Sequence, residues 1–152
     1  MPARALLPGK DMDVRRPRAS RPSGLRITAV HNRAAGARLT ADEWVLIDND
    51  GPLRWPLDEW ELVAETPHRA RPRVYRFPIR LANTAVWSLE PGESVYVFTC
   101  QGHDRFVEAH GQRPQFLFYW DCDVSGWDIS GVCVYLRSVD GRFATERFPI
   151  PH

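Results

Sequence analysis

Hydrophobic and polar residues alternate along several short stretches of this chain of 152 residues. The alternation has a period of two at Leu25 to Val30, Glu43 to Asp48, Trp60 to Glu65 and Ser94 to Cys100. This period is typical of β-strands, because successive side chains of a strand point to opposite faces of the sheet. Each of the four segments is therefore predicted to be a strand.

Further strands are predicted in the second half of the chain. They are Val74 to Phe77, Phe116 to Trp120, and the two arms of a hairpin, Val132 to Arg137 and Arg142 to Phe148, with a turn at Asp140 and Gly141. Many short strands and no convincing long helix indicate an all-β sandwich. The pattern does not separate a sandwich from a barrel, so both architectures stay open at this point.

Turn residues divide the strands from one another. The sequence DNDGP at residues 48–52 predicts a turn, and the apolar runs on its two sides are interpreted as paired strands. Pro91 and Gly92 fit the two central positions of a type II turn, because glycine accepts a positive φ at the second position. The strand that follows is apolar on both faces, with Val95 and Val97 on one face and Tyr96 and Phe98 on the other, and is predicted to be central. Residues 100–114 are predicted to form a polar loop with one possible helical turn.

Six tryptophans are more than a small core ordinarily consumes. Trp44 and Trp60 are predicted to anchor the core, together with Trp55. Trp55, Trp87 and Trp127 are also candidates for exposed contact residues that bind a protein or carbohydrate partner. The alternative is that these three rings pack in the core or under loops, and their burial decides between the two interpretations.

The N-terminal residues differ from the rest in composition. Residues 1–24 contain four prolines and few large apolar groups, so we expect a disordered basic arm followed by one β-sandwich domain at residues 25–152. The first 23 residues carry a net charge of +4, whereas the remainder carries −3. Arg15, Arg16 and Arg18 are therefore candidates for attracting nucleic acid, and a solubilising tail is the alternative.

The three cysteines and the N-terminal sequence bear on the compartment. An odd number of cysteines and the lack of an apolar signal region predict a cytoplasmic protein. No apolar run approaches the roughly 18 residues that cross a bilayer, so no transmembrane segment is expected.

Two groups of residues have the chemistry of metal ligands. Cys100, His103 and His110, with Cys122 nearby in the sequence, could supply zinc ligands, although their spacing is loose. The simpler interpretation of Cys100 is a small buried apolar side chain. No cofactor is predicted from this group.

The segment DCDVSG at residues 121–126 matches the first half of a calcium-binding loop. Asp121, Asp123 and Ser125 would supply oxygen ligands, but the twelfth position is Val132 instead of a bidentate acid. An EF-hand is therefore rejected. A looser calcium site that includes Asp128 stays a candidate, and a polar loop between strands is the alternative.

Catalysis is not expected from this sequence. His103 and Asp104 are adjacent, and neighbours on an extended strand point to opposite faces, so the acid cannot orient the histidine. No nucleophile elbow and no glycine-rich phosphate loop is present. The chain is predicted not to be an enzyme.

Five segments in order resemble the lamin tail domain family, as a standalone bacterial member. They are LRITAVHN, DEWVLIDNDG, PLDEWEL, the stretch FPIRLANTAVWSLEPGESVYVFTCQG with its LxPGESV element, and WDISGVCVYLRSVDGRF. The resemblance covers about Gly24 to Phe148 and implies an immunoglobulin-like sandwich. It implies a structural or scaffolding module that binds proteins, nucleic acid or cell-surface components through loops or an edge strand, and it carries no catalytic residues.

Overall fold

The computed structural model describes residues 19–31, 43–65, 70–81, 85–121 and 133–150. These residues form eleven strands and one short 3-10 helix. In chain order the elements are β1 (Leu25–His31), β2 (Trp44–Asn49), η1 (Leu57–Glu59), β3 (Trp60–Glu65), β4 (Arg73–Arg76), β5 (Arg80–Leu81), β6 (Ala85–Val86), β7 (Ser94–Phe98), β8 (Arg105–Val107), β9 (Gln115–Tyr119), β10 (Cys133–Ser138) and β11 (Phe148–Pro149).

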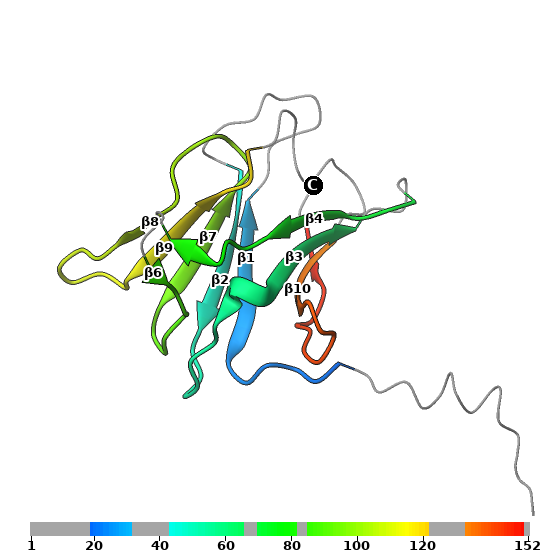
Figure 1. Cartoon of the computed structure of the whole chain (residues 1–152), viewed down its shortest axis with the longest axis horizontal. Helices are drawn as coiled ribbons and strands as arrows, with labels where there is room; N and C mark the ends of the chain where they lie inside the picture. Colours follow the sequence, from blue (N-terminus) through cyan, green and yellow to red (C-terminus); the bar gives the residue numbers. More distant parts are fainter. Residues whose placement is uncertain (1–18, 32–42, 66–69, 82–84, 122–132, 151–152) are drawn as a thin grey trace, which may run out of the picture.

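The strands form two main sheets, which confirms the prediction of an all-β sandwich. The five-stranded sheet has the order β1-β2-β7-β9-β8, and the four-stranded sheet has the order β11-β10-β3-β4 (Figure 1). The strands β5 and β6 form a separate two-stranded sheet. Each main sheet keeps two edge strands within the described residues, so the architecture is a sandwich and not a closed barrel.

The prediction that the runs on either side of the DNDGP turn pair with each other is wrong. β2 pairs with β1 and β7, whereas β3 pairs with β10 and β4, so the two runs lie in different sheets. The turn is the first part of a connection that crosses from one sheet to the other and ends in η1.

The central position of β7 is confirmed, because it lies third in the five-stranded sheet. Its pairing with β9 is parallel, with Val97 opposite Phe118. The prediction of a polar loop at residues 100–114 is wrong in one respect. Arg105–Val107 forms the edge strand β8, which pairs with β9. Within this segment the described residues contain no helix.

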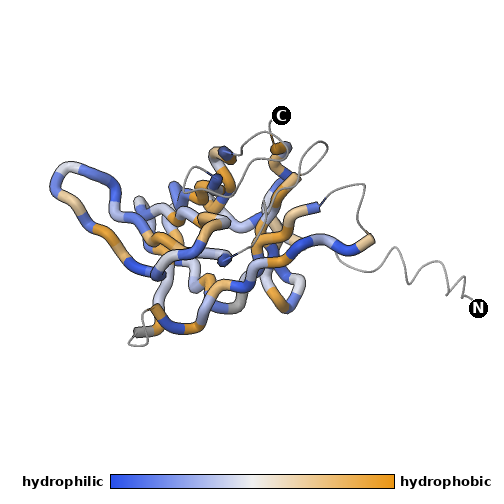
Figure 2. The backbone as a smooth tube through the Cα atoms, turned by 90° about the horizontal axis from the view of Figure 1, so that it is seen from above, coloured by the Kyte–Doolittle hydropathy of each residue, from blue (hydrophilic) through white to orange (hydrophobic). Residues whose placement is uncertain are grey.

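The core lies between the two main sheets. Along the strands, hydrophobic residues alternate with hydrophilic ones (Figure 2), and the inward-facing members are buried. Val45, Val97 and Phe118 come from the five-stranded sheet, whereas Leu62 and Leu136 come from the four-stranded sheet; all five are fully buried. Each buried side chain of this size contributes about 1.5 to 3 kcal/mol to folding.

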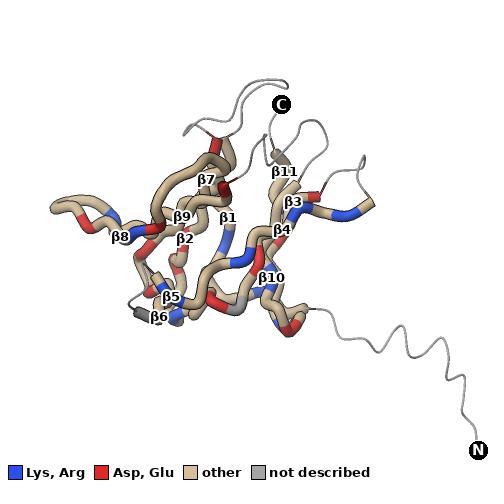
Figure 3. The backbone as a smooth tube through the Cα atoms, turned by 45° about the horizontal axis from the view of Figure 1, so that its top comes forward, with Lys and Arg blue, Asp and Glu red and all other residues tan. Residues whose placement is uncertain are grey.

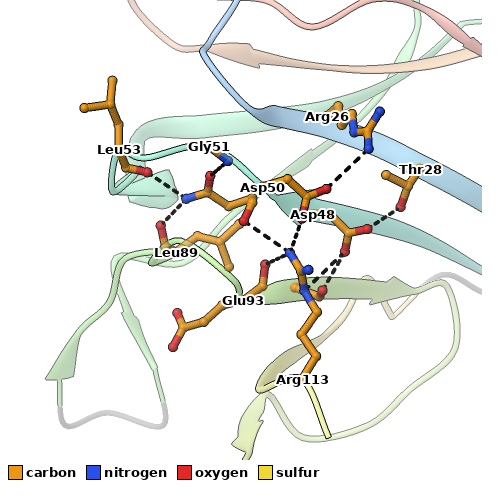
Figure 4. Close-up of polar contacts among 11 residues, drawn as sticks. Arg26, Thr28, Asp48, Asp50, Gly51, Leu53, Leu89, Glu93 and Arg113 are labelled. Carbon is orange, nitrogen blue, oxygen red and sulfur yellow. Dashed lines mark hydrogen bonds and ion pairs between the residues drawn. The ribbon is translucent and has the colours of Figure 1, made fainter.

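The buried side chain of Asn49 fixes the crossing between the sheets by hydrogen bonds to Gly51, Leu53 and Leu89, which are labelled in Figure 4. Its Nδ2 donates hydrogen bonds to the carbonyl oxygens of Leu53, at 2.8 Å, and Leu89, at 2.9 Å. Its Oδ1 accepts a hydrogen bond from the backbone N–H of Gly51 at 3.2 Å, and its carbonyl oxygen accepts one from Arg113 Nη2 at 3.2 Å. The side chain therefore holds the end of β2, the crossing loop and the loop before β7 together.

The turn at Pro91 and Gly92 forms as predicted. Gly92 has a φ of 88°, and the backbone N–H of Glu93 donates to the carbonyl oxygen of Glu90 at 3.1 Å. The N–H of Gly92 also donates to the carbonyl oxygen of Asn49 at 2.8 Å, so this turn is attached to the crossing.

Residues 19–24 belong to the folded domain, so the last six residues of the predicted arm are not an arm. The carbonyl oxygen of Ser20 accepts a hydrogen bond from the N–H of Ala144 at 2.9 Å. The indole N–H of Trp55 donates to the carbonyl oxygen of Ser23 at 3.1 Å. The segment is therefore attached both to the connection after β10 and to the crossing between the sheets.

Gly24 and Gly51 approach each other at the backbone. Gly24 has a φ of +72°, and a Cβ added to it would lie 2.2 Å from the Cα of Gly51. No side chain fits there without moving the backbone, because real Cβ atoms do not come so close to another backbone. The N–H of Asp50 donates to the carbonyl oxygen of Gly24 at 2.9 Å, which completes the contact.

We expect Gly24→Ala to destabilise the domain more than Gly111→Ala. The two glycines have nearly the same positive φ, +72° and +77°, but nothing lies within 4 Å of a Cβ on Gly111. Gly111→Ala should therefore lower the free energy of unfolding by only the cost of the left-handed backbone, about 1 to 2 kcal/mol. Gly24→Ala should lower the free energy of unfolding by about 1 to 3 kcal/mol more than this, because its Cβ overlaps another backbone. Urea unfolding curves of both variants measure the difference, and equal losses would contradict the close approach.

Candidate functional site

A row of aromatic rings crosses the outer face of the five-stranded sheet. We call Trp44 of β2, Tyr96 and Phe98 of β7, and Tyr119 of β9 the aromatic row; all four side chains are half-buried. They alternate along their strands with core residues, so they point away from the core. Ring centroids lie 5.3 Å apart between Trp44 and Tyr96, 5.8 Å between Tyr96 and Phe98, and 5.1 Å between Phe98 and Tyr119.

Two nitrogen-bearing side chains lie at the ends of the aromatic row. His31, the last residue of β1, stacks on Trp44 with ring centroids 5.5 Å apart. At the other end, the guanidinium of Arg105 lies 5.8 Å from the centre of the Tyr119 ring, and its Nη1 donates to the Tyr119 hydroxyl at 3.2 Å. Together with His31 and Arg105, the aromatic row spans all five strands of the sheet, from β1 to the edge strand β8.

The sequence contained a signal for this row that sequence reasoning used only for the fold. Tyr96 and Phe98 were predicted to share one face of a strand that is apolar on both faces. In a two-layer sandwich only one face of each sheet meets the core, so the second apolar face has to point outward. Trp44, predicted to anchor the core, instead points outward, because the inward positions of β2 are Val45 and Ile47.

The tryptophans proposed as exposed contact residues are not exposed where the structure describes them. Trp55 is 8% exposed and Trp87 is 4% exposed, so both belong to the core. The indole N–H of Trp87 donates to the carbonyl oxygen of Pro78 at 2.7 Å, and the ring packs 4.7 Å from Phe118. The alternative interpretation, core packing, is the correct one for these two rings. Trp127 lies outside the described residues.

Several other candidates also lie outside the described residues. These are Arg15, Arg16 and Arg18 of the arm, Cys122, and the calcium candidates Asp123, Ser125 and Asp128. Asp121 is described and is exposed, just after β9. Its role in a calcium site therefore stays a prediction.

The zinc candidates are spread over the region between β7 and β9. Cys100 is half-buried, and burial raises the pKa of its thiol above the usual value, which disfavours the thiolate that binds zinc. His103 is exposed before β8, and His110 is exposed in the turn between β8 and β9. Among the described residues, no three side chains of histidine, cysteine, aspartate or glutamate are grouped closely enough to hold a metal ion.

Asp104 supports β9 through a hydrogen bond to its backbone. Its Oδ1 accepts a hydrogen bond from the backbone N–H of Tyr119 at 3.0 Å. Burial raises the pKa of the Asp104 carboxyl, and the hydrogen bond from Tyr119 opposes the rise. Burial also raises the pKa of the Tyr75 hydroxyl, and the charge of Asp104 adds to this rise. Asp104 therefore binds the end of β9 and lies close enough to Tyr75 of β4 for its charge to act on that hydroxyl.

Charges of both signs are interspersed over the described domain (Figure 3). Many are paired, as in the ion pairs of Arg137 with Glu61, at 3.0 Å, and Arg147 with Glu65, at 2.9 Å. Within the described residues, no helix has the length and apolar character needed to cross a membrane.

Neither the protein-family models nor the curated proteins with which the sequence was compared gave a match to this chain.

We expect Asp104→Asn to stabilise the domain at neutral pH and to have little effect in acid. The folded state raises the pKa of Asp104 above its ordinary 3.8, so ionisation of this carboxyl costs stability as the pH rises through the folded pKa. Asparagine has no charge and keeps an oxygen that can accept the N–H of Tyr119. The stability gain should therefore grow above pH 3.8 and vanish below it, as measured by urea unfolding across this range.

Asp50→Asn is the matched control with the opposite sign. Hydrogen bonds from Arg113 and Arg26 hold the pKa of Asp50 below its ordinary 3.8. This variant should be less stable than the wild type above pH 3.8, and the difference should be lost as the pH falls through the lowered pKa. The same pH trend in both variants would contradict the assignment for Asp104.

Proposed function

We propose that this protein is a non-enzymatic interaction module that binds a macromolecular partner through the outer face of its five-stranded sheet. The observation that carries the proposal is the aromatic row, whose rings contact one another across β2, β7 and β9 instead of facing the core. Aromatic side chains are enriched at protein interfaces, because they bury a large area at a small cost in conformational entropy. The sequence predicted a contact through loops or an edge strand, and we add the outer face of the five-stranded sheet as the contact surface.

The lamin tail resemblance is part of this proposal. The motif residues quoted for it have structural roles that suit a compact recognition domain: Asn49 holds the crossing, Pro91 and Gly92 form the turn before the central strand, and Trp60 is buried. These roles concern the scaffold and are compatible with a family whose members bind different partners through different surfaces. The ligand is therefore argued from the surface of this chain alone.

A purely structural role for the aromatic row has a limited energetic effect. Cross-strand aromatic pairs stabilise a sheet by about 0.2 to 1 kcal/mol each. Rings that become buried against a partner often dominate the binding free energy. Truncation of such a ring weakens binding by at least about 2 kcal/mol. The two roles therefore differ in the size of the effect on binding relative to the effect on folding.

We expect Phe98→Lys to remove partner binding and leave the domain folded. Phe98 is half-buried on the outer face, so a lysine there can direct its ammonium to solvent while the strand keeps its backbone hydrogen bonds. The free energy of unfolding should fall by about 1 kcal/mol, and the amount of captured partner should fall about thirtyfold or more. Capture on immobilised protein from the native cell, followed by quantitative mass spectrometry, measures the second effect.

Val74→Lys provides the control on the other sheet. Val74 lies on the edge strand β4 and is 37% exposed, so this variant adds the same charge to a surface that the proposal does not use. Its captured proteins should match those of the wild type. Retention of every partner by Phe98→Lys, or equal losses in both variants, would overturn the proposed surface.

Association with nucleic acid is the second candidate function. Aromatic rings on an open sheet can stack with bases of a single strand, and basic residues nearby attract its phosphates. The aromatic row ends at Arg105, and Arg15, Arg16 and Arg18 precede the residues that anchor the N-terminal segment. This combination favours single-stranded over duplex nucleic acid.

We expect removal of residues 1–18 to weaken binding of a single-stranded oligonucleotide and to reduce its salt dependence. These residues carry five of the six basic charges before residue 24, and the deletion keeps the anchored residues 19–24. For every phosphate that the shortened chain no longer neutralises, the slope of log K against log salt should become shallower by about 0.7. Fluorescence anisotropy at several salt concentrations measures this slope. Unchanged affinity and slope, or equal affinity for single-stranded and duplex DNA, would contradict this function.

A further inference from the structure

A small hollow lies against three aromatic rings at the crossing between the sheets. Trp55, Trp60 and Phe143 line it, and its volume is about 280 Å³. Trp55 stands nearly perpendicular to both other rings, with centroid distances of 5.8 Å to Trp60 and 5.2 Å to Phe143. Trp60 and Phe143 are close to parallel, at 14° and 6.1 Å. The aromatic row lies on the five-stranded sheet, whereas Trp60 begins β3 of the four-stranded sheet.

Two carboxylates border these rings. Asp58 of η1 and Asp140 of the turn after β10 both line the hollow, and both are absent from the ion pairs of the described residues. Hydrogen bonds from the backbone N–H of Arg142 and from the Ser138 hydroxyl hold the pKa of Asp140 below its usual value. Its carboxyl is therefore ionised at neutral pH, and the border of the hollow is negative.

The protein already places a cation on one of these rings. The guanidinium of Arg142 lies 5.4 Å from the centre of the Phe143 ring, within the distance of a cation–π interaction. Arg142 does not line the hollow. The aromatic quadrupole of Phe143 and the charge of Asp140 thus attract a positive group of the chain itself beside the hollow.

We propose that this hollow binds the head group of an organic ammonium ion. The half-buried ring of Phe143 and the small exposed parts of Trp55 and Trp60 provide the apolar and cation–π surface, and Asp58 and Asp140 provide the opposite charge. The volume of about 280 Å³ lies just below the range of drug-sized pockets, about 300 to 1,000 Å³, so it suits one head group and not a large ligand. A methylated lysine side chain and a free quaternary ammonium compound share this chemistry. The hollow shares no lining residue with the aromatic row.

Choline and its uncharged isostere, 3,3-dimethyl-1-butanol, test the proposal on the full chain. The two compounds have nearly the same shape and differ in the charge of the head group. In two-dimensional NMR, choline should shift the backbone amides of Asp58, Ser138 and Phe143 in a saturable manner. Its dissociation constant should be lower than that of the isostere by about tenfold. Equal affinity for the two compounds, or shifts that do not saturate, would overturn the site.

Asp58→Asn tests the charge without disturbing the aromatic rings. Removal of this half-buried acid should weaken choline binding by about threefold to fivefold. Asp121→Asn is the matched control, because Asp121 is an exposed acid that does not line the hollow. Choline affinity that is unchanged in Asp58→Asn, or reduced equally in both variants, would also overturn the proposal.

A third titration distinguishes the two sources of the ammonium group. Acetyl-trimethyllysine amide carries the same head group as choline on a peptide backbone. Tighter binding of this compound than of choline supports a methylated protein as the ligand, and equal binding supports a free quaternary ammonium compound. Failure to bind either compound at the amides of Ser138 and Phe143 would contradict the shared chemistry.

Discussion

The hydrogen bonds of Asn49 are the constraint on which the arrangement of the two sheets depends. β2 ends in one sheet and β3 begins in the other, and the described chain between them pairs with the loop before β7 at one isolated bridge, Trp55 with Leu89. The Asn49 side chain binds two backbone groups of this connection, the carbonyl oxygen of Leu53 and the N–H of Gly51, and the carbonyl oxygen of Leu89 in the loop before β7. The side chain of Asn49 is itself fully buried, and a polar group left unpaired in the interior costs about 1 to 3 kcal/mol.

The same crossing brings the aromatic hollow together. It delivers Trp55 and Asp58 to the start of β3, where Trp60 enters the core. The anchored N-terminal segment holds Trp55 from one side through Ser23, and it pairs at Ser20 with the connection that carries Phe143. Residues from three distant parts of the sequence therefore meet at one place, and their relative positions depend on backbone contacts and not on loops that move independently.

Sequence patterns predicted local features well and long-range relations poorly. The bounds of β3 and the turn at Pro91 and Gly92 follow from alternation and from the φ that glycine allows, which are properties of a few neighbouring residues. The separation of β2 from β3 and the parallel pairing of β7 with β9 depend on contacts across the chain. β8 was missed because three residues are too few to display a period. The burial of Trp55 and Trp87 was undecidable, because a large aromatic ring suits both a core and an interface.

The edges of the sandwich explain why a sheet face is the better candidate for recognition than an edge strand. β8 has three residues, and β4 has four and begins and ends at an arginine. The longer edge strand β1 (Leu25–His31) has a register shift between Ile27 and Ala29. Short edges, charged residues and bulges all discourage pairing with another chain. The aromatic row, in contrast, crosses the middle of the sheet, where the backbone of β7 is paired on both sides. A partner there would contact side chains alone, so specificity would follow from the rings and from His31 and Arg105 at the two ends of the row, and the sheet itself would not be extended.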